Sequence, residues 1–262
     1  MLSYLGKVWS CRFFWLSLVR NDLRARYRRS ILGLGWSLFR PILTTIIMCV
    51  VFRKLFHRAD LWTYAPYLLS GLCCWDYIVS ATKQGCHCFF QGESYIRQHP
   101  TPIAIFPLRV ALAETFHFVV ALLVLVGTVW YVQGFGNLPM LLSLVPTLLL
   151  LFGLAWAMAL LAGGMNVYFQ DTQHLCDVGF QVLFYATPII YTPQDLGEGR
   201  LHWVVTHLNP LVPFLDLFRE PILYARVPEL QSYCSASLIV LLIGSCAALV
   251  CARWQRRLIF HL

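Results

Sequence analysis

Long apolar runs separated by short polar segments dominate the pattern of this chain of 262 residues. A helix needs about 20 apolar residues to cross a hydrocarbon layer about 30 Å thick. Most of the runs reach that length, and they occupy residues 31–52, 61–81, 110–132, 138–165 and 233–252. A shorter run, residues 178–191, contains Pro188. Because lipid offers backbone groups no hydrogen-bond partner and the runs are too long for barrel strands, we expect six membrane-spanning helices.

Composition supports an all-α integral membrane protein. Hydrophobic residues make up 59% of the chain and charged residues only 12%, against about 25% charged residues in soluble domains. Between the fifth and sixth spans, the apolar residues 201–218 are interrupted by Pro210 and Pro213. Such interruptions predict re-entrant or interfacial helices, within an outward-side region covering residues 192–232. We therefore expect residues 1–262 to form a single transmembrane domain.

The distribution of Lys and Arg predicts the orientation, because these residues cluster in cytoplasmic segments. Most of the 20 Lys and Arg residues fall in segments that would be cytoplasmic if the N-terminus is inside. The group Arg53, Lys54 and Arg58 opposes this trend. We expect both termini to lie in the cytoplasm.

The N-terminal segment has the composition of a helix that lies in the membrane interface. Residues 9–29 mix aromatic and apolar side chains with many arginines, so residues 1–30 can bury an apolar face while the arginines meet anionic lipid head groups. A simple topology anchor is an equal alternative. The net charge of +8 is explained by this placement, and we expect no nucleic-acid partner. The arginines of the predicted interface helix are Arg20, Arg24, Arg26, Arg28 and Arg29.

The loop of residues 83–108 contains a compact polar segment, residues 91–99, closed by Pro100 and Pro102. A short helix there would protrude from the membrane and could dock into a soluble partner, or it could be a solvated connector. The residues that would make the contact are Glu93, Ser94, Tyr95, Arg97 and Gln98.

Acidic residues within the spans are costly in hydrocarbon, about 2.5–3.5 kcal/mol each, so Asp76 and Glu114 should face protein or water. His117 lies three residues after Glu114, on the same helical face. The pair could form a proton relay or a structural hydrogen bond between helices. Since Glu114 lies about one turn from Arg109, near the end of the span, we favour the structural role and leave Asp76 open.

The sequence has no motif for bound cofactors or familiar enzyme chemistry. It has neither G-x-S-x-G nor H-E-x-x-H. It also lacks the phosphate-binding loop G-x-x-x-x-G-K-[ST], so any ATP and Mg²⁺ must be bound by another chain. Most cysteines lie in or beside apolar runs, where cysteine behaves as a small hydrophobe, and we expect no metal.

Three segments make the sequence recognisable: RNDLRARYRRSILGLGWSLFRPIL, YFQDTQHLCDVGFQVLFYATPIIYTP and LNPLVPFLDLFREPIL, which are residues 20–43, 168–193 and 208–223. In them the chain resembles the type-2 ABC exporter permeases that move polysaccharides. The resemblance implies a homodimeric permease in the bacterial inner membrane, paired with a homodimer of separate ATPase subunits. Its cargo would be a lipid-linked glycan such as O-antigen, capsule or teichoic acid.

The resemblance also implies roles for particular segments. Residues 9–29 would be the interface helix, residues 91–99 the coupling helix that inserts into the ATPase, and residues 201–224 the gate helices with Asn209, Pro210 and Arg219. A glycan conduit between two copies would need aromatic walls, and ordinary helix packing or an interfacial belt would also explain such rings. The candidate conduit aromatics are Tyr64, Tyr67, Trp75, Phe180, Phe184, Tyr185 and Tyr191.

Two other functions fit parts of the pattern. One is a permease for drugs, lipids or haem in the same superfamily, whose members often carry a large outer domain or a fused ATPase. The other is a membrane-embedded enzyme acting on a lipid-linked sugar, which predicts a polar acidic pocket at one face of the membrane.

Overall fold

The computed structural model describes residues 2–28, 35–55, 61–98, 101–136, 139–197 and 199–254, and within these ranges the regular structure is helical. The first half contains α1 (Leu2–Ser10), α2 (Arg12–Tyr27), α3 (Gly35–Leu55), α4 (Leu61–Cys86), α5 (Cys88–Gln98) and α6 (Ile105–Gln133). The second half contains η1 (Met140–Ser143), α7 (Leu144–Tyr168), α8 (Thr172–Ala186), η2 (Pro193–Leu196), α9 (Arg200–Leu208), α10 (Val212–Leu223) and α11 (Leu230–Trp254).

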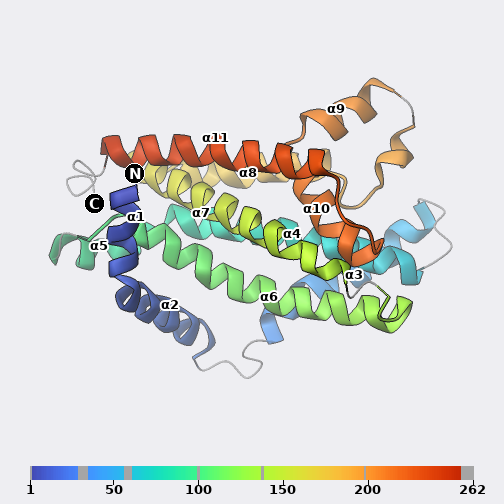
Figure 1. Cartoon of the computed structure of the whole chain (residues 1–262), viewed down its shortest axis with the longest axis horizontal. Coiled ribbons are helices and arrows are strands. Elements are labelled where there is room, and N and C mark those ends of the chain that lie inside the picture. Colours follow the sequence, from blue (N-terminus) through green and yellow to red (C-terminus); the bar gives the residue numbers. More distant parts are fainter. Residues whose placement is uncertain are drawn as a thin grey trace.

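The long helices run side by side along the long axis of the molecule (Figure 1). The N-terminal helix α1, the short helix α5 and the C-terminal end of α11 lie together at one end of this bundle, on the left of the view. Helix α9 lies at the opposite end. The predicted coupling segment and the predicted gate segment are therefore at opposite ends of the molecule.

Three helices in the described ranges are long and apolar enough to cross a membrane: Ile105–Val132, Met140–Tyr168 and Leu230–Arg253. Helix α3 contains a shorter apolar stretch, Pro41–Val51. Helix α8 has 15 residues and is therefore about 22 Å long. It ends before Pro188, because a residue that precedes proline is disfavoured in helical geometry. Thr187 is accordingly extended, with φ −102° and ψ 136°.

Helix α4 is the centre of the bundle. It packs against α3, α6, α7 and α10, and α7 in turn packs against α11. Small residues let α4 and α7 come unusually close: a Cβ added at Gly85 would lie 2.5 Å from the Cα of Ala159, and one added at Gly163 would lie 2.6 Å from the carbonyl oxygen of Gly85. Close approach at small residues is the usual way membrane helices gain packing energy.

The predicted interface helix is divided in two at Cys11, where α1 ends and α2 begins. Helix α1 is held by Val8, which is buried against Ala104, Ile105 and Leu108. Helix α2 lies along α6.

The outer face of α1 and α2 is apolar. Trp9, Phe13 and Leu16 are exposed by 65%, 73% and 50%, as expected of side chains that enter lipid. Arg20, Arg24 and Arg28 are also exposed, whereas Arg29 lies outside the described residues. The exposed apolar face and these arginines have the arrangement expected of an interfacial helix.

Candidate functional site

Helix α5 covers most of the segment predicted to form a short polar helix, although it begins three residues earlier than expected and His99 lies outside the described residues. Its buried face consists of Cys88, Phe89, Gly92 and Ile96. A Cβ added at Gly92 would lie 2.4 Å from the ring of Phe106, so α5 sits directly on α6.

The opposite face of α5 carries the predicted contact residues. Ser94, Tyr95, Arg97 and Gln98 are exposed, and Glu93 is half-buried. The Arg97 Nε donates a hydrogen bond of 2.8 Å to Glu93 Oε1 one turn earlier. The predicted docking surface is thus a small polar face at the end of the bundle.

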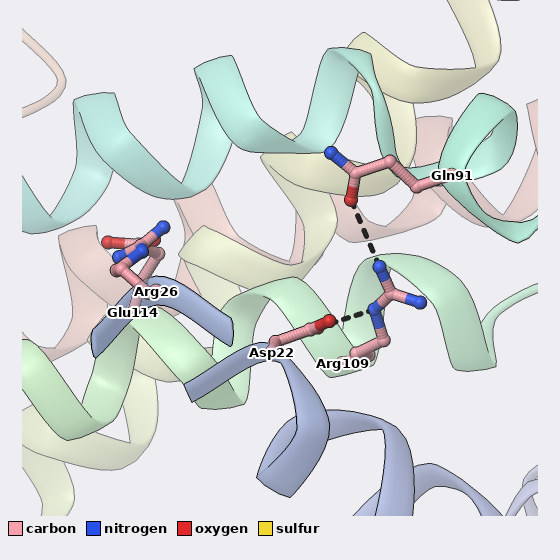
Figure 2. Close-up of polar contacts among 5 residues, drawn as sticks. All are labelled: Asp22, Arg26, Gln91, Arg109 and Glu114. Carbon is pink, nitrogen blue, oxygen red and sulfur yellow. Dashed lines mark hydrogen bonds and ion pairs between the residues drawn. The ribbon is translucent and has the colours of Figure 1, made fainter. Parts of the chain in front are cut away.

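A cluster of five polar residues connects α2, α5 and α6, and we call it the α2–α6 cluster (Figure 2). Arg109 on α6 is only 5% exposed. Its Nε forms an ion pair of 2.6 Å with Asp22 Oδ2 on α2, and its Nη2 donates a hydrogen bond of 3.0 Å to Gln91 Oε1 on α5. A second ion pair joins Arg26 Nη2 on α2 to Glu114 Oε1 on α6 at 2.8 Å.

This cluster gives Glu114 the structural partner that the sequence favoured, but the partner is Arg26, which was predicted to meet lipid head groups. Burial raises the pKa of Asp22, and the neighbouring guanidinium groups of Arg109 and Arg26 oppose that rise. No local sequence pattern pairs these charges, because Arg26 and Glu114 are 88 residues apart.

Two cavities adjoin the α2–α6 cluster and share Arg26 and Glu114 in their walls. One has a volume of about 170 Å³ and is also lined by Trp36, Asp76, Tyr77 and His117. The other has a volume of about 150 Å³ and is also lined by Asp22, Gln84 and Gln91. Asp76 and Glu114, the two acids predicted within spans, therefore face the same cavity.

A second cluster surrounds Arg219 of α10, which is only 4% exposed. Its Nη1 donates hydrogen bonds of 2.7 Å to the carbonyl of Pro188 and 3.0 Å to the hydroxyl of Tyr67. Its Nε donates one of 3.2 Å to Ser70 Oγ, and its guanidinium lies 3.8 Å from the centre of the Tyr67 ring. Gly71 leaves room for it, since a Cβ there would lie 2.6 Å from Arg219 Nη2.

Asn209, also predicted as a gate residue, forms hydrogen bonds to the turn after α8. Its Nδ2 donates to the carbonyl of Ala186 at 3.0 Å and to Thr187 Oγ1 at 2.9 Å. Its Oδ1 accepts the backbone N–H of Leu211 at 2.9 Å, just before α10, and Pro210 is exposed between α9 and α10. Asn209 and Arg219 together connect the turn after α8 to α10 and, through Tyr67, to α4.

The aromatic residues predicted for a conduit divide into two groups. Tyr64, Tyr67, Trp75 and Phe180 are buried, and ordinary packing accounts for them in this conformation. Tyr64 donates a hydrogen bond of 2.7 Å to the carbonyl of Ile190, and Trp75 contacts the ring edge of Phe180.

The second group is accessible. Tyr185 is 66% exposed, and Phe184 and Tyr191 are partly exposed. Phe184 and Tyr185 lie near the C-terminal end of α8, and Tyr191 lies in the turn after it.

Another link that the sequence did not suggest joins α4 to α8: Lys83 Nζ lies 2.5 Å from Asp177 Oδ1.

Cysteines 11, 49, 73, 74, 86, 88, 176, 234, 246 and 251 are all free. In the described ranges, no group of three or more His, Cys, Asp or Glu side chains could hold a metal ion.

Comparison with known proteins gives a consistent result. A protein named O-antigen export system permease protein RfbA from Klebsiella pneumoniae is 26% identical over 206 residues, which cover 78% of this chain and 77% of that protein. A protein of the same name from Myxococcus xanthus is 25% identical over 232 residues, covering 88% of each. The polysialic acid transport protein KpsM of Escherichia coli is 24% identical over 234 residues, covering 87% of this chain and 89% of KpsM.

The family model described as ABC-2 type transporter matches residues 14–223. This match runs from α2 to the end of α10 and includes both the α2–α6 cluster and the residues around Arg219. The chain belongs to the ABC-2 type transporter family.

Proposed function

We propose that this chain is the transmembrane permease subunit of an ATP-driven exporter that moves a lipid-linked polysaccharide across the bacterial inner membrane. The cargo is of the O-antigen, capsule or teichoic-acid type. The observation that carries the proposal is similarity, along most of the chain, to proteins named for O-antigen export and polysialic acid transport. The long apolar helices found in the described part of the chain support a membrane location.

ATP and Mg²⁺ belong, in this proposal, to a separate homodimeric ATPase that binds the exposed face of α5. The sequence contains no phosphate-binding loop. Helix α5 lies at the same end of the bundle as α1 and the C-terminal end of α11 (Figure 1). We place this end, and with it both termini, on the cytoplasmic side, which agrees with the excess of Lys and Arg.

Six membrane crossings follow if α3, α4, α6, α7 and α11 each cross once and α8 crosses together with its extended turn. The turn adds residues 187–191 to a helix about 22 Å long. Helices α9 and α10 then form the outward-side gate. Two observations support this assignment of α9 and α10. Helix α9 lies at the opposite end of the molecule from α5 (Figure 1), and Asn209 and Arg219 are buried.

The exposed face of α8 supports a second copy and a shared conduit. It combines apolar side chains with the polar residues His174 and Gln181 and with Tyr185. A helix face that meets only lipid carries few polar groups, because they find no partner there. We infer that this face lines the passage between two copies, with Phe184 and Tyr191 beside it. The buried Tyr64, Tyr67, Trp75 and Phe180 would reach the glycan only after rearrangement.

The ATPase contact can be tested with the double variant E93A/R97A. We expect it to reduce co-purification of the partner ATPase by about threefold or more, because it removes the charged groups of the docking face. Glycan should accumulate inside the cells. The matched control is R226A/E229A, which removes an exposed base and acid near the start of α11, far from α5. Unchanged ATPase association in E93A/R97A would contradict the proposed docking surface.

The cavity that contains Asp76 and Glu114 is the observation that favours the alternative of a membrane-embedded enzyme. Against it, Glu114 is ion-paired with Arg26, so Asp76 and Glu114 do not form a free pair of acids in this cavity. We expect D76N to retain surface glycan. Loss of surface glycan in D76N, with normal folding and ATPase association, would favour the enzyme.

A further inference from the structure

The charges that join α2 to α6 have opposite order on the two helices. Along α2 the acid Asp22 precedes the base Arg26, whereas along α6 the base Arg109 precedes the acid Glu114. Figure 2 shows the result: each charge faces its opposite across the helix pair, at 2.6 Å for Asp22 with Arg109 and 2.8 Å for Arg26 with Glu114.

This order specifies how far α2 can slide along α6. The two charges are separated along their helices by about 6 Å on α2 and about 7.5 Å on α6. Sliding α2 by one turn in one direction would bring Arg26 to Arg109, and sliding it in the other would bring Asp22 to Glu114. Both alternatives oppose like charges, so only the observed register satisfies both pairs.

Because they are partly buried, the two ion pairs fix the position of α2 along α6 more strongly than surface ion pairs would. The side chains of Arg109 and Glu114 on α6 are only 6% and 7% exposed, whereas Asp22 and Arg26 on α2 are 35% and 40% exposed. Salt screens such buried charges weakly. Removing either α2 partner would leave a buried charge on α6 uncompensated, which is strongly unfavourable.

Arg109 extends this connection to α5. Its guanidinium contacts Asp22 of α2 and Gln91 of α5 from the same buried position on α6. The neighbouring Gly92 holds α5 against Phe106, also of α6. Helix α2 therefore meets the consecutive helices α5 and α6 at one side chain, although it lies far from them in the sequence.

A cavity adjoins the cluster between α2, α4, α5 and α6. Its volume of about 150 Å³ would accommodate a few water molecules, at about 30 Å³ each. Its walls include Asp22, Gln84 and Gln91. Besides the bonds to Arg109, an aromatic contact joins α2 and α5 directly, because the rings of Phe14 and Tyr95 meet edge to face with their centres 5.6 Å apart.

We propose that Arg109 is a positioning residue and that the two ion pairs make α2, α5 and the adjoining turns of α6 move as one body. A displacement of α5 by the ATPase is then delivered to α2 in the membrane interface. This inference rests on the proposed function, in which α5 contacts the ATPase.

Charge exchange tests the two pairs in cells that contain the permease and its ATPase. We expect D22R, R109D, R26E and E114R each to lower surface glycan about tenfold or more, because each opposes like charges. D22R/R109D and R26E/E114R should recover export to within about threefold of wild type, since the amide of Gln91 can turn its NH₂ group toward a carboxylate at position 109. The mismatched control R26E/R109D should not recover.

Thermal unfolding of the same variants, purified without the ATPase, tests the ion pairs independently of the proposed export function. Each single exchange should lower the thermal unfolding temperature of the permease, and each matched double exchange should restore it. Double variants no better than the single ones, in both stability and export, would overturn the inference. A wild-type chain that neither binds an ATPase nor exports glycan would refute the proposed function whatever the stability results show.

A milder change tests the connection to α5. Q91L removes the acceptor for Arg109 at the start of α5, whereas Q91E keeps an acceptor. We expect Q91L to bind the ATPase normally but to export about threefold less glycan per ATP hydrolysed in inverted membrane vesicles, with Q91E close to wild type. A purely structural role for Gln91 would change assembly but not this ratio. Equal ratios for wild type and Q91L would overturn the proposal.

Discussion

Replacing Arg219 with methionine should loosen the contact between α10, α4 and the turn after α8. Methionine preserves much of the length of the side chain but provides no hydrogen-bond donor. The carbonyl of Pro188 would keep only the Tyr67 hydroxyl, 3.1 Å away, and Ser70 Oγ would lose the donor now at 3.2 Å. The contact of the guanidinium with the Tyr67 ring would also disappear.

The expected cost follows from these lost interactions. Net hydrogen bonds from a charged donor contribute about 1.5–3 kcal/mol each, and the ring contact adds about 1–2 kcal/mol at a buried position. The desolvation of the guanidinium is removed at the same time and offsets part of this loss. We therefore expect R219M to destabilise the protein by about 3 kcal/mol, which corresponds to a fall of about 6–12 °C in unfolding temperature for a protein of this size.

The assay is thermal unfolding of the purified permease in detergent, together with surface glycan in cells. R219K should be intermediate, because a single ammonium cannot bond to Ser70 and Pro188 in the arrangement of a planar guanidinium. The control is R226M, which changes an exposed arginine near the same end of the molecule. An unfolding temperature of R219M equal to that of R226M would show that the contacts of Arg219 do not stabilise the fold.

Three further predictions concern packing and the conduit. G92A should displace α5 from α6, because the new methyl group would meet the Phe106 ring at 2.4 Å. Co-purification of the ATPase should therefore fall. The control G127A, where a new Cβ would have open space around it, should behave as wild type. G85A should lower the unfolding temperature by an amount equivalent to about 1–3 kcal/mol of overpacking against α7, and an unchanged temperature would show that α4 and α7 can separate freely. Y185A should slow glycan export without loss of stability, and normal export would show that this exposed ring does not contact the cargo.

Local features of the sequence were enough to predict much of the helical arrangement. The polar segment before Pro100 predicted α5, but its first turn was missed because Cys88, Phe89 and Phe90 are not polar and the prediction rested on polar residues alone. The apolar run of residues 178–191 suggested a span that ends at Tyr191. The helix ends at Ala186, because Pro188 disfavours helical geometry for Thr187.

Contacts between distant segments could not be predicted in the same way. Arg219 drew attention as an arginine in an apolar segment, which must find a partner. Its partner Tyr67 lies 152 residues away, and no local pattern connects the two positions. The same holds for Arg26 and Glu114, whose charges were recognised separately but whose pairing depends on how α2 lies along α6.

The central claim is that this chain is the permease through which a polysaccharide leaves the cell. The most direct measurement is to delete its gene, restore it on a plasmid, and quantify lipid-linked glycan inside the cells and glycan on their surface. We expect deletion to remove surface glycan while lipid-linked glycan accumulates inside, and we expect the restored gene to reverse both changes. Unchanged surface glycan after deletion, with no accumulation inside, would contradict it.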